Sequence, residues 1–210
     1  MALHFPLRKL SVARKEIFLT FDDGPDEEFT PQVLAVLKAA SAPATFFLIA
    51  EKAAKNLELT QRILSEGHAI GDHSLDHDYK NYFLSRDKTK QWVQRSQSLL
   101  KDLTHRTPVG FRSPAGIWTP KLSSVLKELE IPWIHWDTRF YDSILPWKKS
   151  SVDSSLRRLT PGSIILLHDR QKPANRTQFL STLSYFIEKA QAKGFSFRKI
   201  VDSKRDKRIK

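Results

Sequence analysis

The chain contains no cysteine and one methionine among its 210 residues. The absence of cysteine excludes disulfide bonds, a cysteine nucleophile, and zinc or iron–sulfur sites with thiolate ligands. No apolar run approaches the roughly 18 residues that a membrane-spanning helix needs. Residues 1–17 carry four basic side chains with no apolar run between them, so no signal peptide is predicted. The sequence as it stands therefore predicts a cytoplasmic protein, and export stays open for a form that has been trimmed.

Acidic residues are scarce relative to basic ones. Lys and Arg number 35 against 23 Asp and Glu, which gives a formal net charge of +12 at pH 7. Such an excess favours an anionic partner, for example a nucleic acid, a lipid surface or a charged wall polymer. Because no nucleic-acid recognition motif is present, we expect an anionic glycan and no nucleic acid. We also expect a monomer, and peripheral contact with a membrane stays open.

Short apolar runs alternate with longer helical patterns along the whole chain. This alternation predicts a parallel α/β sheet with right-handed crossovers, and the number of near-equal units favours a closed or nearly closed barrel. No glycine-rich phosphate loop follows the first strand, which argues against a nucleotide site. The predicted strands are 17–21, 44–49, 68–73, 109–111, 133–137, 163–167 and 195–200. The first predicted helix begins at Thr30, which we expect to be its N-cap. The other predicted helices span 57–66, 85–103, 119–130, 152–159 and 177–193.

Ionisable residues follow the ends of several predicted strands. They are Asp22, Asp23, His73, Arg112, Asp137 and His168. The carboxyl ends of barrel strands converge on one mouth, where chemistry is placed. A single residue of this kind is often structural, because Asp begins turns and Arg pairs with Asp. The whole set at one rim predicts an active site.

His73 and His77 are four residues apart. If this segment turns helically, both imidazoles lie on one face and suit a zinc-like ion. One of the two adjacent aspartates, Asp22 or Asp23, would complete the ligand set, and the other would act as a general base. An arginine would hold that base ionised, and a histidine backed by a carboxylate would be the general acid. The remaining histidines are expected at the surface or in packing: His4, His68, His105 and His135.

Five ordered motifs resemble those of the polysaccharide deacetylases, carbohydrate esterase family four. They are Thr20-Phe21-Asp22-Asp23-Gly24-Pro25, His73-Ser74-Leu75-Asp76-His77, Arg112-Ser113-Pro114-Ala115-Gly116, Asp137, and Leu166-Leu167-His168-Asp169. The resemblance spans about residues 16–200. It implies a distorted (β/α)7 barrel, similar to a TIM barrel, and hydrolysis of N-acetyl groups on amino sugars of a peptidoglycan-like or chitin-like glycan. We accordingly expect an N-terminal extension (1–15), a catalytic domain (16–202) and a basic tail (203–210).

The resemblance also implies a role for each matching residue. Asp23, His73 and His77 would ligate Zn²⁺, or another divalent metal such as Co²⁺, Mn²⁺ or Ni²⁺. Asp22 would be the base, steadied by Arg112. His168 would protonate the leaving amine and would be tuned by Asp137. The substrate would meet the backbone N–H of Ala115, the ring of Tyr141 and the side chain of Leu166.

Two motifs depart from the family pattern. Ala115 stands where the family usually has Tyr, and Tyr141 stands where it has Trp. The segment that contains Tyr141 keeps only the first of two aspartates, Asp137. The residues implied for chemistry are therefore complete, whereas those implied for substrate contact are altered. The alternatives are an esterase that removes O-acetyl groups from xylan and a deformylase of a lipid-linked amino sugar.

Overall fold

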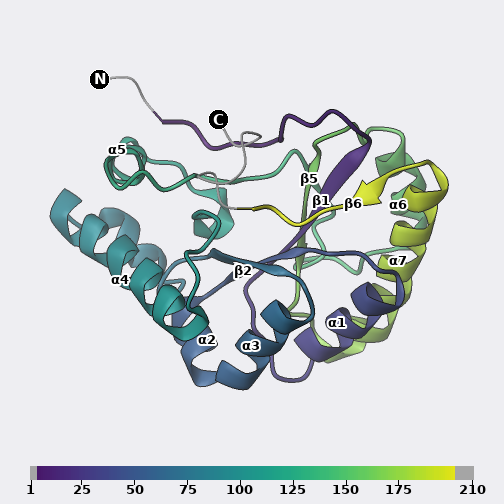
Figure 1. The fold of residues 1–210 in the computed structure, drawn as a ribbon, viewed down its shortest axis with the longest axis horizontal. Helices are drawn as coiled ribbons and strands as arrows, with labels where there is room; N and C mark the ends of the chain where they lie inside the picture. Colours follow the sequence, from purple (N-terminus) through teal and green to yellow (C-terminus); the bar gives the residue numbers. More distant parts are fainter. Residues whose placement is uncertain (1–3, 202–210) are drawn as a thin grey trace.

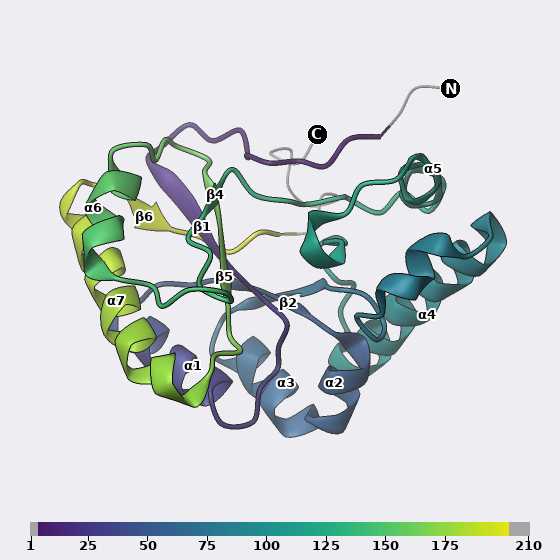
Figure 2. The same ribbon diagram turned by 180° about the vertical axis from the view of Figure 1, so that it is seen from behind.

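The computed structural model describes residues 4–201 and is organised around β1 (Glu16–Asp22), all seven residues of which are buried. A strand buried on both faces is typical of a parallel sheet covered by helices. On one side β1 pairs with β2 (Thr45–Leu48), which pairs with β3 (Ala69–Asp72). On the other side it pairs with β5 (Ile164–His168), which pairs with β4 (Thr138–Arg139). The order β3-β2-β1-β5-β4 is parallel throughout, and Figure 2 shows β5 and β4 beside β1.

Isolated bridges close this sheet into a barrel. Asp72 at the end of β3 bridges to Phe111, and Phe111 bridges to Trp133, on the segment that leads into β4. The short β6 (Ser196–Phe197) pairs with the first two residues of β1. The predicted parallel α/β barrel is therefore confirmed, with distortion concentrated on the side of Phe111. There the predicted strand 109–111 is reduced to one bridged residue. The predicted strand 133–137 is reduced to single bridges at Trp133 and Ile134, and β4 begins only after it.

Helices surround the strands, as Figure 1 shows. They are α1 (Thr30–Ala39), α2 (Ala50–Lys55), α3 (Leu57–Ser65), α4 (Arg86–Thr104), α5 (Pro120–Glu128), α6 (Lys149–Leu156) and α7 (Pro173–Ala192). Two 3₁₀ helices, η1 (Tyr79–Phe83) and η2 (Pro114–Gly116), follow β3 and the Phe111 bridge. The structure describes no helix long and apolar enough to cross a membrane.

Capping side chains explain several helix starts. Ser85 and Thr119 accept hydrogen bonds from the backbone N–H of Lys88 and Leu122, as expected of N-caps. The prediction for Thr30 is wrong by one residue. Thr30 is the first residue of α1, and its hydroxyl accepts from the backbone N–H of Asp26. The sequence does not predict α2, a helix of six residues that precedes the amphipathic pattern beginning at residue 57.

The pleat of β1 divides its side chains between two cores. Ile17, Leu19 and Phe21 join the cluster under the helices, whereas Phe18 lies in the smaller cluster inside the barrel. Every second residue of a strand faces the same side. Asp22, four residues after Phe18, therefore also faces the inside of the barrel, at the carboxyl end of β1. The described part of the extension packs at the opposite end, where Leu10 is buried. The predicted tail, 203–210, lies outside the described residues.

Candidate active site and metal centre

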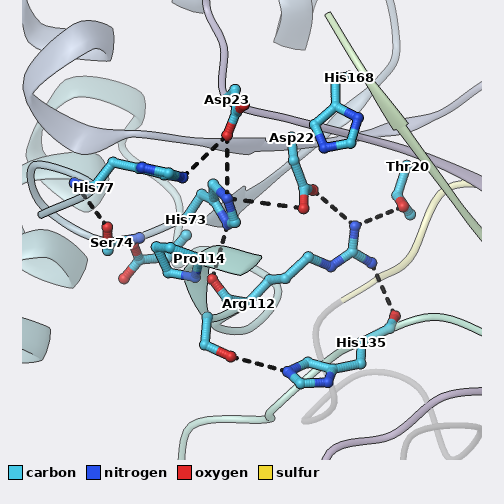
Figure 3. Close-up of polar contacts among 12 residues, drawn as sticks. Thr20, Asp22, Asp23, His73, Ser74, His77, Arg112, Pro114, His135 and His168 are labelled. Carbon is cyan, nitrogen blue, oxygen red and sulfur yellow. Dashed lines mark hydrogen bonds and ion pairs between the residues drawn. The ribbon is translucent and has the colours of Figure 1, made fainter. Parts of the chain in front are cut away.

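The structure brings most of the predicted site residues to one place, the carboxyl end of the barrel. Asp22 is the last residue of β1, and His168 is the last residue of β5. The two are partners in the parallel register of these strands. Figure 3 shows Asp22 between His168 on one side and the imidazole of His73 on the other. The rim therefore assembles as the strand ends predict.

Three donor atoms converge at this rim. Asp23 Oδ1 lies 3.4 Å from His73 Nε2 and 3.3 Å from His77 Nε2 (Figure 3). Zinc bonds to nitrogen and oxygen of about 2.0–2.1 Å in a tetrahedron place neighbouring ligands about 3.3 Å apart. The spacing of the three donors therefore fits a small divalent ion. Within the described residues, this trio is the one group of histidine and carboxylate ligands close enough to hold a metal ion.

Backbone turns, and not a helix, place these ligands. Asp23 and His77 adopt positive φ angles of 75° and 61°, and Ser74 adopts 76°. The expected helical turn at 73–77 is absent: the His77 backbone N–H instead bonds the Ser74 hydroxyl, at 3.1 Å. The turn at Asp23 explains how two adjacent carboxylates reach one mouth although neighbouring strand residues point apart. Left-handed φ angles cost free energy in non-glycine residues and are often found at functional sites.

A hydrogen bond from the second ring nitrogen fixes the orientation of the His73 imidazole. Its Nδ1 lies 2.9 Å from the backbone carbonyl oxygen of Arg112, and this oxygen only accepts hydrogen bonds. Nδ1 therefore carries the proton, and Nε2 is left as a lone-pair donor facing Asp23. Burial opposes the ionisation of Asp23, but contacts with His73 and His77 outweigh it and hold the pKa of this carboxyl below its usual range. Both features suit ligation of a cation.

Arg112 anchors Asp22 from inside the barrel. The guanidinium is fully buried, and its Nη1 donates to Asp22 Oδ1 at 2.8 Å and to Thr20 Oγ1 at 2.7 Å. Its other nitrogens donate to the carbonyl oxygens of Ile134 and His135. Asp22 Oδ2 stays outside this network, 3.8 Å from His73 Nε2. One oxygen of Asp22 is thus held by Arg112 while the other faces the three donors.

The carboxylate partner of His168 differs from the expected one. His168 Nδ1 lies 3.1 Å from Oδ1 of the buried Asp142, whereas the exposed Asp137 accepts a hydrogen bond from Ser163. The expectation that Asp137 contacts His168 is thus corrected. The chain turns at Tyr141, which has a φ of 58°, and this turn directs the next residue inward. The spacing of the family motif indicated the earlier aspartate, and the sequence alone does not show the turn.

Asp142 is itself held by several donors. Its Oδ2 accepts from the His168 backbone N–H at 2.8 Å and from Gln171 Nε2 at 2.9 Å. Burial alone would lower the pKa of His168. The hydrogen bond and negative charge of Asp142, together with the charges of Asp22 and Asp23, outweigh burial and raise this pKa to about 9. The raised pKa favours the protonated imidazole of His168.

The three residues expected to contact substrate lie near this rim with different exposures. Ala115 is exposed in η2 and has a φ of 53°. Leu166 is buried in β5, two residues before His168 and on the same strand face. Tyr141 is half-exposed, and its hydroxyl accepts a hydrogen bond from Arg139, 2.7 Å away. Their places are compatible with contact to a substrate at the mouth.

Two further buried carboxylates support the site and were not singled out from the sequence. Asp72 accepts hydrogen bonds from Ser96, Gln97 and the backbone N–H of Ser74, and it directly precedes His73 in the sequence. Asp169 accepts from Thr30 at 2.6 Å, and burial raises its pKa to about 7. The sequence offers one indication for both carboxylates, because each is next in sequence to a site histidine.

Comparison with known proteins agrees with this geometry. A family profile for polysaccharide deacetylases matches residues 9–134. The chain belongs to the polysaccharide deacetylase family.

Two curated deacetylases align with most of this polysaccharide deacetylase. A chitooligosaccharide deacetylase of Bradyrhizobium sp. (strain ANU 289) is 32% identical over 190 residues, which are 86% of this chain and 87% of that protein. A peptidoglycan-N-acetylglucosamine deacetylase of Bacillus cereus is 32% identical over 187 residues, 87% of this chain and 85% of that protein. Both alignments therefore span most of this chain and most of each relative.

Solved structures show the same fold. The Bc1960 peptidoglycan N-acetylglucosamine deacetylase superposes with a TM-score of 0.82 at 29% identity, covering 92% of this chain and 89% of that one. BA3943, a family-four pseudoenzyme from Bacillus anthracis, superposes with a TM-score of 0.80 at 22% identity, covering 93% of this chain and 67% of that one. Because a pseudoenzyme shares the fold, the fold alone does not establish activity, which depends on the side chains of this chain.

Proposed function

We propose that this polysaccharide deacetylase is a metal-dependent hydrolase that removes N-acetyl groups from N-acetylated amino sugars of an oligosaccharide or polysaccharide. The observation that carries the proposal is the convergence of three metal-type donors with two groups suited to proton transfer. The donors belong to Asp23, His73 and His77, and the flanking groups to Asp22 and His168. Metal-assisted hydrolysis needs these parts: a ligand set with open positions, a base and an acid.

Asp23, His73 and His77 would hold the ion, and zinc is the metal that this donor set fits best. When bound, such an ion supplies Lewis-acid polarisation of the amide carbonyl and lowers the pKa of water. The second imidazole nitrogen of His73 is already bonded to the Arg112 carbonyl. This contact keeps the ligand oriented without further rearrangement.

Asp22 would act as the general base. Its Oδ2 faces the donor trio, while Oδ1 is bonded to the buried guanidinium of Arg112. A neighbouring positive charge favours the ionised carboxylate, which is the form that takes a proton. Asp22 would accept this proton from the attacking water as the new carbon–oxygen bond forms. Arg112 would keep the carboxylate in place and is a positioning residue.

His168 would act as the general acid. As the carbon–nitrogen bond breaks, the departing nitrogen needs a proton, and protonated His168 would donate it from Nε2. Asp142 keeps Nδ1 in hydrogen-bond contact and stabilises the charged imidazole. In our proposal Asp142 therefore has the role that the family resemblance assigned to Asp137. The products would be acetate and a free amine.

The substrate class follows from the relatives and from this chain's charge. Both curated relatives are named for N-acetylated glycans, a chitooligosaccharide and a peptidoglycan. The backbone of Ala115 and the side chains of Leu166 and Tyr141 would contact the acetylated sugar. A net charge of +12 favours encounter with an anionic glycan over a neutral one.

The test is hydrolysis of parallel substrates by the zinc-loaded protein, followed as release of acetate, or of formate from the formylated substrate. The panel contains chitooligosaccharides, peptidoglycan fragments, acetylated xylan and a formylated amino sugar. We expect release of acetate, and appearance of amine, from one or both N-acetylated substrates. Turnover confined to acetylated xylan or to the formylated sugar would replace the proposal with the corresponding alternative activity. No turnover of any member would refute it.

A further inference from the structure

A cavity lies at the opposite end of the barrel from the candidate active site. Its volume is about 650 Å³, and its walls include the start of β3 and the last turn of α4. Since β3 runs from this cavity to His73, the two sites are separated by the length of the strand. The volume is within the roughly 300–1,000 Å³ usual for small-molecule sites.

Cations gather at this cavity without a matching carboxylate among its lining residues. Among residues 4–201, Lys101, Arg106 and Lys199 line it, and no acidic residue does. Burial and the nearby charge of Arg106 lower the pKa of Lys199. Glu66, whose charge acts on His68 in the wall, is already paired with Arg62 at 2.6 Å. Positive charges held close together without a nearby negative charge favour the binding of an anion.

A buried hydrogen-bond donor without a partner belongs to one of the residues that line the cavity. His68 is 3% exposed and lines the cavity. Its Nδ1 accepts a hydrogen bond from the backbone N–H of Ala44 at 3.1 Å, so a neutral ring carries its proton on Nε2. This Nε2 is buried and has no hydrogen-bond partner in the described part of the chain. Buried polar groups are nearly always paired, so an unpaired one calls for an explanation.

Apolar side chains form the remaining wall. Ile70, Val109 and Ile200 line the cavity beside the cations. A ligand that satisfies both parts of the lining has an anionic group and an apolar portion. We propose that this cavity binds an organic phosphate or carboxylate through Arg106, Lys199 and His68. The site would be separate from deacetylation and is not assigned by the family resemblance.

The test uses hexyl phosphate as probe, with the zinc-loaded protein at neutral pH. We expect saturable binding by calorimetry, with a Kd on the order of millimolar for so small a ligand, weakened by added salt. Inorganic phosphate and hexyl glucoside should each bind more weakly, because each lacks one part of the ligand. Addition of hexyl phosphate should also shift the NMR signal of the His68 Nε2–H. Hexanoate tests an organic carboxylate in the same assay.

The variant Arg106→Gln with Lys199→Gln should weaken hexyl phosphate binding at least tenfold. Lys38→Gln, an exposed substitution on α1, is the matched control for loss of positive charge. The cations also lie near the carboxyl ends of α3 and α4, where they can offset helix dipoles. If the double variant lowers the melting temperature but binds hexyl phosphate as the wild type does, the charges serve only the helices and the proposal is wrong. Binding that disappears when zinc is removed would place the probe at the catalytic mouth and would equally overturn it.

Discussion

Replacing Asp142 by Asn should remove the proton-donating capacity of His168 at alkaline pH. Relative to an ordinary value of 6.5, the pKa of about 9 corresponds to roughly 3 kcal/mol in favour of the protonated ring. Asp22 and Asp23 supply part of this, so Asp142 accounts for only a share. A bound cation opposes protonation of His168. The alkaline limb of the wild-type pH–rate profile should therefore lie at or below about pH 9. In D142N we expect this limb to move down by at least about one pH unit.

The assay is the pH dependence of kcat/KM for acetate release, with Asp137→Asn as the matched control. Near pH 8.5, a limb that moves from about 9 to about 8 lowers the protonated fraction of His168, and with it the D142N rate, about threefold, and a larger shift lowers it further. D137N changes an exposed carboxylate bonded to Ser163 and should leave the alkaline limb in place. A shift in D137N together with an unchanged limb in D142N would refute the assignment of Asp142.

The same variant also has a predicted effect on folding. The raised pKa of His168 stabilises the folded protein fully below pH 6.5, and this contribution is lost as the pH rises through about 9. Asp142 accepts three N–H groups, and an asparagine amide cannot accept all of them. D142N should therefore lose about 1–3 kcal/mol of stability at pH 6. Denaturant unfolding at pH 6 and pH 9.5 should show a smaller difference between variant and wild type at the higher pH.

Three further predictions concern the site's supports. Arg112→Met should cost about 3–5 kcal/mol in denaturant unfolding, because Asp22 is buried and loses its charged partner; a loss under 1 kcal/mol, as is usual for an exposed pair, would contradict this. Gly24→Ala should lower the melting temperature, since an added Cβ would lie 2.2 Å from Asp169 Oδ2; an unchanged melting temperature would show that Asp169 moves freely. Zinc at 100 times its Kd should stabilise the wild type by about 2.7 kcal/mol. His77→Ala should abolish this stabilisation, and retention of it would remove His77 from the ligand set.

The sequence predicts the fold class and most of the rim because both depend on local patterns. The buried run of β1 and the capped starts at Ser85 and Thr119 are visible as residue types at fixed spacings. Strand ends then bring Asp22 and His168 together through the parallel register. These predictions need no knowledge of how distant loops turn.

Other features depend on loop geometry that residue spacing does not encode. The left-handed turn at Tyr141 directs Asp142 toward His168, although the motif pattern indicates Asp137. Likewise, His73 and His77 meet through positive φ angles at Ser74 and His77, where spacing alone favours a helical turn. The His68 donor belongs to the same group, because only the structure shows which ring nitrogen is used.

In the proposed mechanism, Asp22 is a base beside a metal site that it does not complete. Asp22→Asn tests this directly when zinc content and acetate release are measured on the same sample. The variant should fold, because Arg112 keeps its bonds to Thr20 and to two backbone carbonyls. We predict one zinc per chain, as in the wild type, and acetate release reduced by at least about 10²-fold. Undiminished acetate release, or loss of the zinc, would contradict the account.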